Sequence, residues 1–222
     1  MLDTFFMLDT FFASSAELMA HPTSLFTLLG VLLLILLFLY ARRIKFTTSM
    51  LVYIALMLAL TILLHQLRLY HMPQGGSITC GAMIPLLLIS YRYGSSVGCL
   101  TGFLYGMFNL IQDPFIVHPL QVLFDYPLPY MVLGIAAAIP RHMYLGTAAA
   151  FLARFLCHFI SGAVFFGSYA PAGTSPYLYS LTFNATYLLP EFIICFVLLK
   201  VLPVHRLLHA MDRSSSNHLS VN

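Results

Sequence analysis

Long apolar segments alternate with short polar connections along this chain. The run 24–41 is almost wholly apolar, and six more apolar segments follow at about 47–65, 77–91, 95–112, 119–139, 143–166 and 178–201. A membrane-spanning helix needs about 20 predominantly apolar residues, because each residue advances the helix by about 1.5 Å. The pattern predicts an all-α integral membrane protein, with a six-helix membrane domain at 44–203 and one extra N-terminal transmembrane helix at 24–41.

The two ends of the chain differ from this pattern. Residues 1–23 begin with a tandem MLDTFF duplication that is too short to be a structural repeat, and we expect this segment to be disordered. Basic residues follow the run 24–41 instead of preceding it, which favours a membrane helix over a cleaved signal peptide. Residues 204–222 are predicted to form a cytoplasmic tail that is disordered from Asp212 onward.

Composition and charge support the membrane assignment. The chain is 60% hydrophobic and 8% charged, whereas soluble domains carry about 25% charged residues. If every segment spans, one side of the membrane holds Arg68 alone, and the other side holds Arg42, Arg43, Lys45, Arg92, Arg141, Lys200, Arg206 and Arg213. By the positive-inside rule this predicts a multi-pass protein of the bacterial plasma membrane with a cytoplasmic C-terminus. The net charge of +3 is too small to indicate nucleic acid binding.

Motifs for catalysis and for metal binding are absent from the sequence. It contains no HExxH, no GxSxG and no Walker A motif, so we predict neither an enzyme nor an ATPase in this chain. All four cysteines lie in apolar runs without a CxxC pair and are interpreted as small core residues. No metal site and no cofactor are predicted.

Polar residues recur at helical spacing in the last two predicted helices. Arg154 and His158 are four residues apart on one helix, and Asn184, Tyr187 and Glu191 share a face of the next. Arg154 and Glu191 each lie about 14 Å from the inner ends of their helices. An unpaired charge at that depth would cost about 3 kcal/mol. We therefore predict a structural ion pair between Arg154 and Glu191.

A second polar group is expected at a similar height. Gln121 and Asp125 are four residues apart, and Pro127 and Pro129 follow directly and should bend the helix. A broken helix beside a carboxylate at membrane depth is a recurrent binding-site arrangement in transporters. Asp125 and Gln121 are thus expected to meet the column of polar residues on the last two helices.

The side chains expected around this point suggest a type of ligand. His158, Asn184 and Tyr187 supply polar groups, and Phe166 and Tyr179 lie near the outer ends of their helices. Such a cavity suits a flat, polar heteroaromatic molecule, and a cationic one would gain from the carboxylate and from cation–π contacts. Each polar residue taken alone could instead make an ordinary helix–helix hydrogen bond.

Small residues suggest sites of close helix packing. Gly98, Gly102 and Gly106 recur every four residues and are expected to pack against a neighbouring helix. Ala55 and Ala59 form a similar pair, and their spacing alone fits internal packing and contact with a partner protein equally well. The loop around Pro73 and Gly75-Gly76 is expected to end at a Ser77 N-cap, either as a flexible lid or as an ordinary tight connection.

Three stretches resemble one known family. RFLCHFISGAVFFGSYAPAGTSPYLYSLTFNATYLLPE, HPLQVLFDYPLPY and PQGGSITCGAMIPLLL are similar to the thiamine-specific S component (ThiT family) of energy-coupling factor (ECF) transporters, over about residues 44–203. The resemblance implies a six-helix bundle in the lipid bilayer that captures thiamine from outside. It also implies association with an ECF transmembrane coupling protein and two cytoplasmic ATPase subunits, with Ala55 and Ala59 as docking positions.

The resemblance also implies binding residues. His158, Tyr179 and Asn184 match the family's binding histidine, tyrosine and asparagine, and Asp125 matches its acidic residue, with Gln121 as a rival. Phe166 stands where some members have a stacking tryptophan, and this chain has no Trp, so stacking must come from Phe or Tyr.

Three other interpretations compete with thiamine capture. One is an S component for another water-soluble vitamin or a pyrimidine precursor. Another is an intramembrane enzyme that uses His158 with Ser161 or Asp125. The third is a membrane scaffold whose polar column is only structural.

Overall fold

The computed structural model describes residues 22–139 and 141–216. Disorder was predicted at 1–23; residues 1–21, with the duplication, lie outside the described residues, and 22 and 23 belong to the first described helix. The chain divides into two compact units, residues 1–36 and 37–222, which are described separately. The first described helix, α2 (Pro22–Ala41), matches the extra apolar helix predicted at 24–41.

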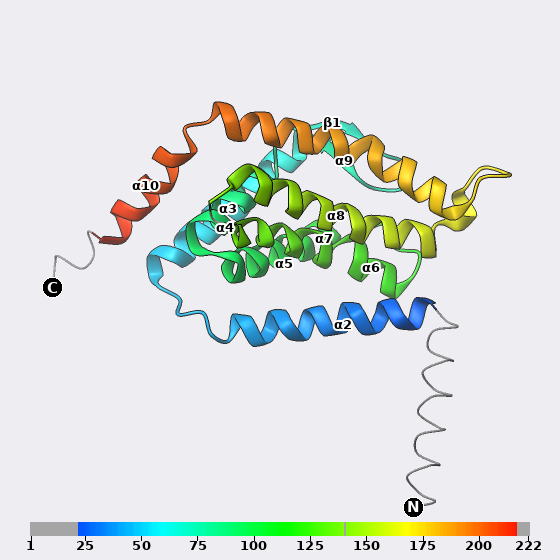
Figure 1. The fold of residues 1–222 in the computed structure, drawn as a ribbon, viewed down its shortest axis with the longest axis horizontal. Coiled ribbons are helices and arrows are strands. Elements are labelled where there is room, and N and C mark those ends of the chain that lie inside the picture. The colour runs from blue at the N-terminus through cyan, green and yellow to red at the C-terminus, as the bar shows by residue number, and fades with distance from the viewer. Residues whose placement is uncertain (1–21, 140, 217–222) are drawn as a thin grey trace, which may run out of the picture. The chain divides into compact units, whose positions relative to one another are not determined.

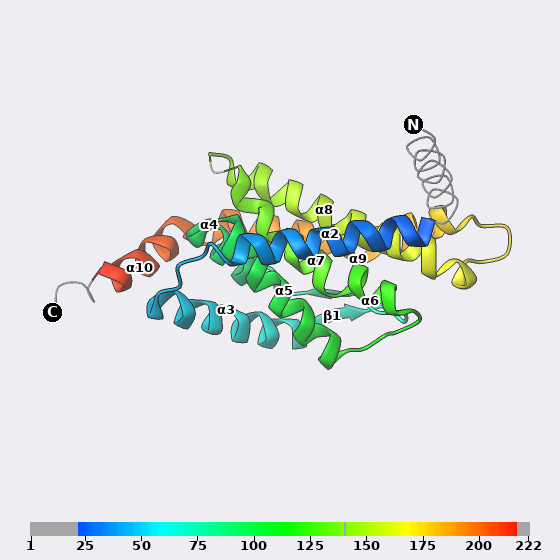
Figure 2. The same ribbon diagram turned by 90° about the horizontal axis from the view of Figure 1, so that it is seen from below.

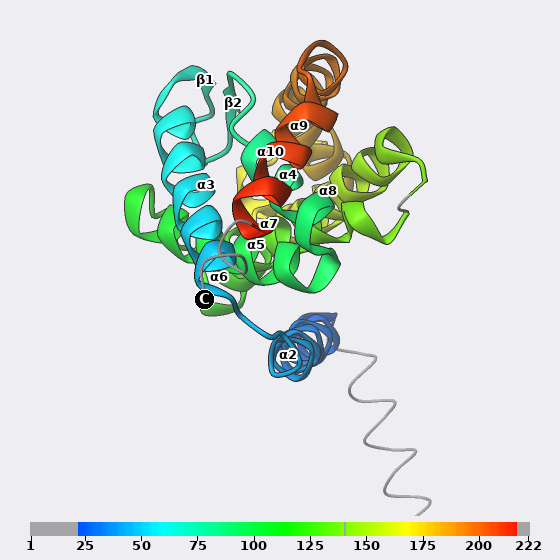
Figure 3. The same cartoon turned by 90° about the vertical axis from the view of Figure 1, so that its left-hand side faces the viewer.

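A helical bundle makes up the second unit. Its main elements are α3 (Thr48–Gln66), α4 (Ile84–Tyr93), α5 (Ser95–Gln112), α6 (Pro119–Asp125), α7 (Pro127–Met131), α8 (Met143–Phe165), α9 (Pro176–Val201) and α10 (Val204–Ser216). Helices α8 and α9 pack side by side (Figure 1). Viewed end-on, α3, α8 and α9 surround α4 and α7 (Figure 3), which hold much of the buried apolar core.

Close packing around α5 follows the predicted glycine stripe. Gly98 lies against Ser90 of α4, while Gly102 and Gly106 lie against backbone atoms of Tyr130 and Tyr126, where a Cβ would not fit. Helix α5 also contacts α3 on its other side (Figure 2). The prediction of close packing is confirmed, because only glycine lets the two backbones approach so closely.

The prolines after Asp125 divide the fourth predicted segment into three pieces. Helix α6 ends at Asp125, α7 begins at Pro127, and a 3-10 helix, η1 (Val132–Ala138), completes the segment. Proline cannot donate the backbone hydrogen bond that a continuous helix requires. The predicted bend is confirmed, and it leaves the Asp125 side chain at the end of a short helix.

The predicted helix beginning at Ser77 is wrong, and the fold is not all-α in this region. Residues Arg68–His71 (β1) and Ser77–Thr79 (β2) form an antiparallel hairpin, and helix α4 begins only at Ile84. Gly75 and Gly76 adopt φ of 88° and 91°, which favour glycine and allow the tight turn. Hydrogen bonds from Thr79 to Glu191 hold β2 against α9.

The predicted tail is also partly wrong. The tail was predicted to be disordered from Asp212 onward, but residues 204–216 form helix α10, while 217–222 lie outside the described residues. The buried side chains of Val204 and Met211 join core clusters of the bundle. Burial of these apolar side chains stabilises α10 against the bundle.

Several helices are suited to a bilayer. Within the described residues, four helical segments are long and apolar enough to cross a membrane, and these are 48–66, 119–138, 143–165 and 176–201. Large apolar side chains such as Leu63 and Val52 are more than half exposed along α3. Ala55 and Ala59 lie on this exposed side, so they do not serve as internal packing residues. A surface of this kind is stable next to lipid.

Candidate ligand-binding site

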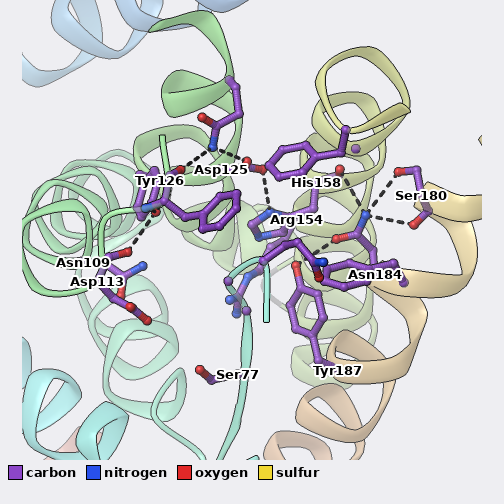
Figure 4. Close-up of a pocket in the computed structure, with 18 of the residues that line it drawn as sticks. Ser77, Asn109, Asp113, Asp125, Tyr126, Arg154, His158, Ser180, Asn184 and Tyr187 are labelled. Atoms are coloured by element: carbon purple, nitrogen blue, oxygen red, sulfur yellow. Dashed lines mark hydrogen bonds and ion pairs between the residues drawn. The ribbon is translucent and has the colours of Figure 1, made fainter. Parts of the chain in front are cut away.

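A cavity lies between α5, the broken α6–α7 segment, α8 and α9, with the hairpin loop at its mouth (Figure 4). Its atom-free space, counted together with the solvent at its open mouth, is about 710 Å³. All seven residues predicted to bind a ligand line it: Gln121, Asp125, His158, Phe166, Tyr179, Asn184 and Tyr187. The structure therefore brings them together, while their role in binding stays a prediction.

The Asp125 carboxylate is held at the helix break by two neighbours. Gln121 Nε2 donates to Asp125 Oδ2 at 2.6 Å, and Nδ1 of His158 lies 3.3 Å from Asp125 Oδ1. Gln121 is itself fixed, because its Nε2 also donates to the Phe115 carbonyl at 3.0 Å. The Asp125 side chain is 18% exposed, so its charge faces the cavity and not bulk water. Asp125 and Gln121, predicted as rivals, thus form one unit.

A second carboxylate, that of Asp113, also lines the cavity but is already paired. Arg68 Nη1 donates to Asp113 Oδ2 at 2.8 Å, and His71 Nδ1 lies 3.8 Å from the same oxygen. This pairing joins the β-hairpin to the end of α5. It leaves Asp125 as the carboxylate available to a cation in the cavity.

Asn184 connects α9 to α8 beside this carboxylate. Its Nδ2 donates to the carbonyl of His158 at 3.2 Å and to that of Ser180 at 2.9 Å, while Oδ1 accepts from the Tyr187 hydroxyl at 2.9 Å. Gly162 makes the close approach of α8 and α9 possible, because a side chain there would overlap Ser180. The amide group thus positions the His158 backbone and the Tyr187 ring around one point.

Aromatic rings supply the walls of the cavity. Near the mouth, Phe166 stacks on Phe115 with ring centroids 5.9 Å apart, and Tyr169 packs against both. Deeper, the Tyr187 ring meets the His158 ring edge-on at 6.0 Å. These surfaces can hold a flat heteroaromatic ring without any Trp.

The predicted Arg154–Glu191 ion pair is not what the structure shows. Both carboxylate oxygens of Glu191 are taken by Thr79, whose backbone N and Oγ1 each donate at 2.6 Å. The Arg154 guanidinium lies over the Tyr130 ring, 4.6 Å from its centroid. The ion pair was predicted because Arg154 and Glu191 lie at similar depths in their helices. The β-hairpin, which was not predicted, places Thr79 next to Glu191, and Thr79 takes the place of Arg154 as its partner.

Four further residues line the cavity and were not predicted as a group. They are His65, Asn109, Tyr130 and Arg154, and we name these four residues the polar floor. Asn109 Nδ2 donates to the Tyr130 hydroxyl at 3.2 Å. A signal was present, since His65 and Asn109 are polar residues within apolar helices, the same criterion that identified His158 and Asn184.

The contacts of His158 do not form a nucleophile–base pair. Among the described residues, the one side chain within hydrogen-bond distance of its ring is that of Asp125, and the buried Ser161 Oγ has no partner there. The described part of the chain also holds no group of three or more His, Cys, Asp or Glu side chains able to bind a metal ion. The geometry favours holding a ligand over activating a serine.

Comparison with known proteins agrees with this geometry. The model of the thiamine transporter protein family (Thia_YuaJ) matches residues 51–210. The thiamine transporter ThiT of Bacillus subtilis is 41% identical over 152 residues, which cover 59% of this chain and 77% of that protein. ThiT of Lacticaseibacillus paracasei is 28% identical over 122 residues, covering 46% and 61%.

A solved structure supports the fold. ThiT from Listeria monocytogenes superimposes with a TM-score of 0.59, covering 69% of this chain and 94% of that one at 23% identity. An identity this low informs on the fold alone, whereas the family model spans most of the bundle that forms the cavity. The chain is a membrane-embedded member of the thiamine transporter (ThiT) family.

Proposed function

We propose that this chain is the thiamine-capturing S component of an ECF-type importer. The observation that carries the proposal is the Asp125 carboxylate, which faces an aromatic-walled cavity and has no cationic Lys or Arg partner among the described residues. A permanently cationic heteroaromatic ligand supplies the missing charge. Thiamine has such a ring in its thiazolium, joined to a flat aminopyrimidine that can hydrogen-bond and stack.

The remaining groups fit the two rings of thiamine. Aromatic faces at Phe166, Tyr179 and Tyr187 favour a cation by about 2 kcal/mol when water is excluded. His158 and Asn184 present polar atoms at the same depth for the aminopyrimidine. His158 Nε2, which has no partner among the described residues, is the first of these that we assign to the ligand.

Orientation in the membrane follows from charge and from the cavity. Arg92 lies in the last turn of α4, Arg141 lies in the connection before α8, and Lys200 lies near the end of α9. All three are at the end of the bundle away from the cavity mouth. With positive residues in the cytoplasm, the mouth opens outward and the C-terminus is cytoplasmic. The chain would then collect thiamine outside the cell.

Partner docking is assigned to α3. Ala55 and Ala59 lie on its exposed side, where small residues let another helix approach closely. We infer that this face contacts the ECF transmembrane coupling protein, which in turn carries the two cytoplasmic ATPase subunits. This chain has no Walker A motif, so energy must come from such subunits.

Calorimetric titration of the purified chain tests the proposal. Thiamine should bind without ATP, and His158→Ala should weaken binding at least about tenfold, because a buried polar contact is lost. His205→Ala is the matched control, since His205 lies exposed on α10, outside the cavity. No binding of thiamine, or equal effects of the two variants, would reject the proposal.

A further inference from the structure

A groove lies on the outside of the bundle, separate from the ligand cavity. One wall is α3, the other is formed by the end of α9 and by α10, and α4 packs against both walls. We name it the α3–α10 groove and define it by six of its lining residues, Tyr53, Met57, Leu60 and Leu64 of α3 with Leu207 and Ala210 of α10. No described residue lines both the groove and the cavity.

The lining of the α3–α10 groove is apolar. Apart from the Tyr53 hydroxyl and the Cys80 thiol, no lining side chain has a hydrogen-bond donor. The groove is open, since Leu60 is 41% and Leu207 is 38% exposed, and its atom-free space together with the surrounding solvent is about 1010 Å³. An occupant must therefore be apolar along most of the groove.

The length of the groove matches one leaflet of a bilayer. Tyr53 and Leu64 both line it and are eleven residues apart on α3, so it runs for about 16 Å along this helix. The hydrocarbon core of a bilayer is about 30 Å thick, which gives each leaflet about half of this. A phospholipid acyl chain has this reach, whereas a spanning helix of a partner protein needs the full thickness.

Cations lie at the α10 end of the groove, the end that faces the viewer in Figure 3. Arg206 is exposed and stands four residues before Ala210, so it lies on α10 beside the lining. It makes no hydrogen bond or ion pair with the described residues. Lys45 is also exposed, and it directly follows Ile44, which packs against the cluster that contains Met211. Both cations are available to an anionic group at this end.

The groove and the face of α3 assigned to partner docking do not overlap. Each residue turns an α-helix by about 100°, which places Ala55 and Ala59 on one flank of α3 and Tyr53 and Met57 on the other. The buried Ile54 lies between the two flanks. An occupant of the groove therefore leaves the Ala55 face free.

We propose that the α3–α10 groove binds one anionic phospholipid, with an acyl chain along the groove and the phosphate beside Arg206 and Lys45. Charge complementarity favours an anionic headgroup, because basic residues at a membrane surface attract anionic lipids. Among the acidic residues in the described part of the chain, Asp212 alone lies at this end. Lipid binding here does not depend on what the cavity holds.

Native mass spectrometry of the full chain in detergent tests the headgroup contact. Phosphatidylglycerol and phosphatidylcholine with the same oleoyl chains are titrated into the wild type, Arg206→Gln and Arg141→Gln. Arg141 is the matched control, because it is exposed at the same end of the bundle but does not line the groove.

We expect the wild type to retain one phosphatidylglycerol at least about tenfold more tightly than phosphatidylcholine. Arg206→Gln should weaken phosphatidylglycerol about fivefold, equivalent to about 1 kcal/mol, and leave phosphatidylcholine unchanged. Arg141→Gln should change either lipid by less than about twofold. Equal retention of the two lipids by the wild type, or equal losses in the two variants, would overturn the site.

A second pair of variants tests the acyl-chain contact. Ala210→Phe places a ring in the groove and should weaken both lipids at least about fivefold, whereas Ala172→Phe adds the same bulk to an exposed loop and should weaken neither. Unchanged lipid binding in Ala210→Phe would contradict insertion of the chain. A dimer that retains no lipid would instead show that a second copy covers the groove, and this also overturns the proposal.

The cysteines supply a measurement on the wild type that does not depend on the folding of Ala210→Phe. Cys80 is exposed and lines the groove, while Cys99 is half-buried on α5 and does not line it. Phosphatidylglycerol should slow alkylation of Cys80 at least about threefold relative to Cys99, and Arg206→Gln should reduce this protection. Alkylation of Cys80 that phosphatidylglycerol leaves unchanged would reject the proposed lipid position.

Discussion

Replacing Asp125 by Asn removes one negative charge from the cavity and nearly preserves its shape. The amide oxygen of Asn can still accept from Gln121 Nε2, and the ring of His158 can adjust its tautomer to the new NH2 group. The variant thus isolates the charge from the local hydrogen bonds. The quantity to be measured is the dissociation constant of thiamine.

The expected magnitude follows from Coulomb's law. A thiazolium about 4 Å from the carboxylate, at an effective dielectric constant of about 20, gains about 4 kcal/mol. The side chain is 18% exposed, and the neutral amide retains part of the dipolar attraction, so about half of this gain should be lost. A loss of about 2 kcal/mol corresponds to about thirtyfold weaker binding.

Asp113→Asn is the matched control, because Asp113 also lines the cavity but is paired with Arg68 at 2.8 Å. It should change thiamine affinity by about threefold or less, as is usual for partly exposed pairs. A thiamine analogue with an uncharged ring in place of the thiazolium should be insensitive to Asp125→Asn. Equal losses for the charged and the uncharged ligand, or no loss for either, would refute the electrostatic reasoning.

Other expected outcomes concern stability, the amide of α9 and partner docking. Thr79→Val deletes the hydroxyl that donates to Glu191 at 2.6 Å, so the free energy of unfolding should fall by about 1–3 kcal/mol, measured by thermal unfolding. Asn184→Ala removes the group that joins α9 to α8 and positions Tyr187, and thiamine affinity should fall at least about tenfold in a titration. Ala55→Leu adds bulk to the exposed side of α3, so the isolated chain should bind thiamine normally while uptake by cells with the energising subunits falls.

Each of these three variants, Thr79→Val, Asn184→Ala and Ala55→Leu, has a matched control substitution elsewhere in the chain. Thr182→Val and Thr186→Ala alter exposed hydroxyls of α9 that donate to carbonyls of the same helix, and both should leave stability and binding nearly unchanged. If Thr79→Val is no more destabilising than Thr182→Val, the Glu191 contact does not contribute as argued. Ala172→Leu adds the same bulk to an exposed loop, and an equal loss of uptake there would contradict docking through Ala55.

Local rules predicted much of the architecture. Helix α5 has the predicted bounds, 95–112, because a turn-forming Gly94 precedes it and Asp113-Pro114 follows it. The glycine spacing of α5 predicted its close contacts, and the prolines after Asp125 predicted the break that exposes this carboxylate to the cavity. These features depend on backbone geometry within one or two turns, which nearby residues determine.

Long-range pairing was harder to predict. Glu191 and Thr79 are 112 residues apart, and nothing in either segment names the other as its partner. The β-hairpin was not predicted because residues 77–80 (SITC) begin an apolar run whose pattern fits either a helix or a strand. The polar floor draws His65, Asn109, Tyr130 and Arg154 from four separate helices, so no single segment contains its pattern.

The sequence by itself determined the membrane class, most helix bounds and many of the polar residues that lie inside the bundle, because burying a polar group in lipid is costly wherever it occurs. Only the tertiary structure decided which of those groups satisfy one another and which remain turned toward the cavity. Glu191 is hydrogen-bonded by Thr79, and Asp113 is paired with Arg68, whereas Asp125 and Arg154 line the cavity between the helices. Which polar groups pair depends on the distance between their side chains in the folded protein, and that distance cannot be read from their positions in the sequence.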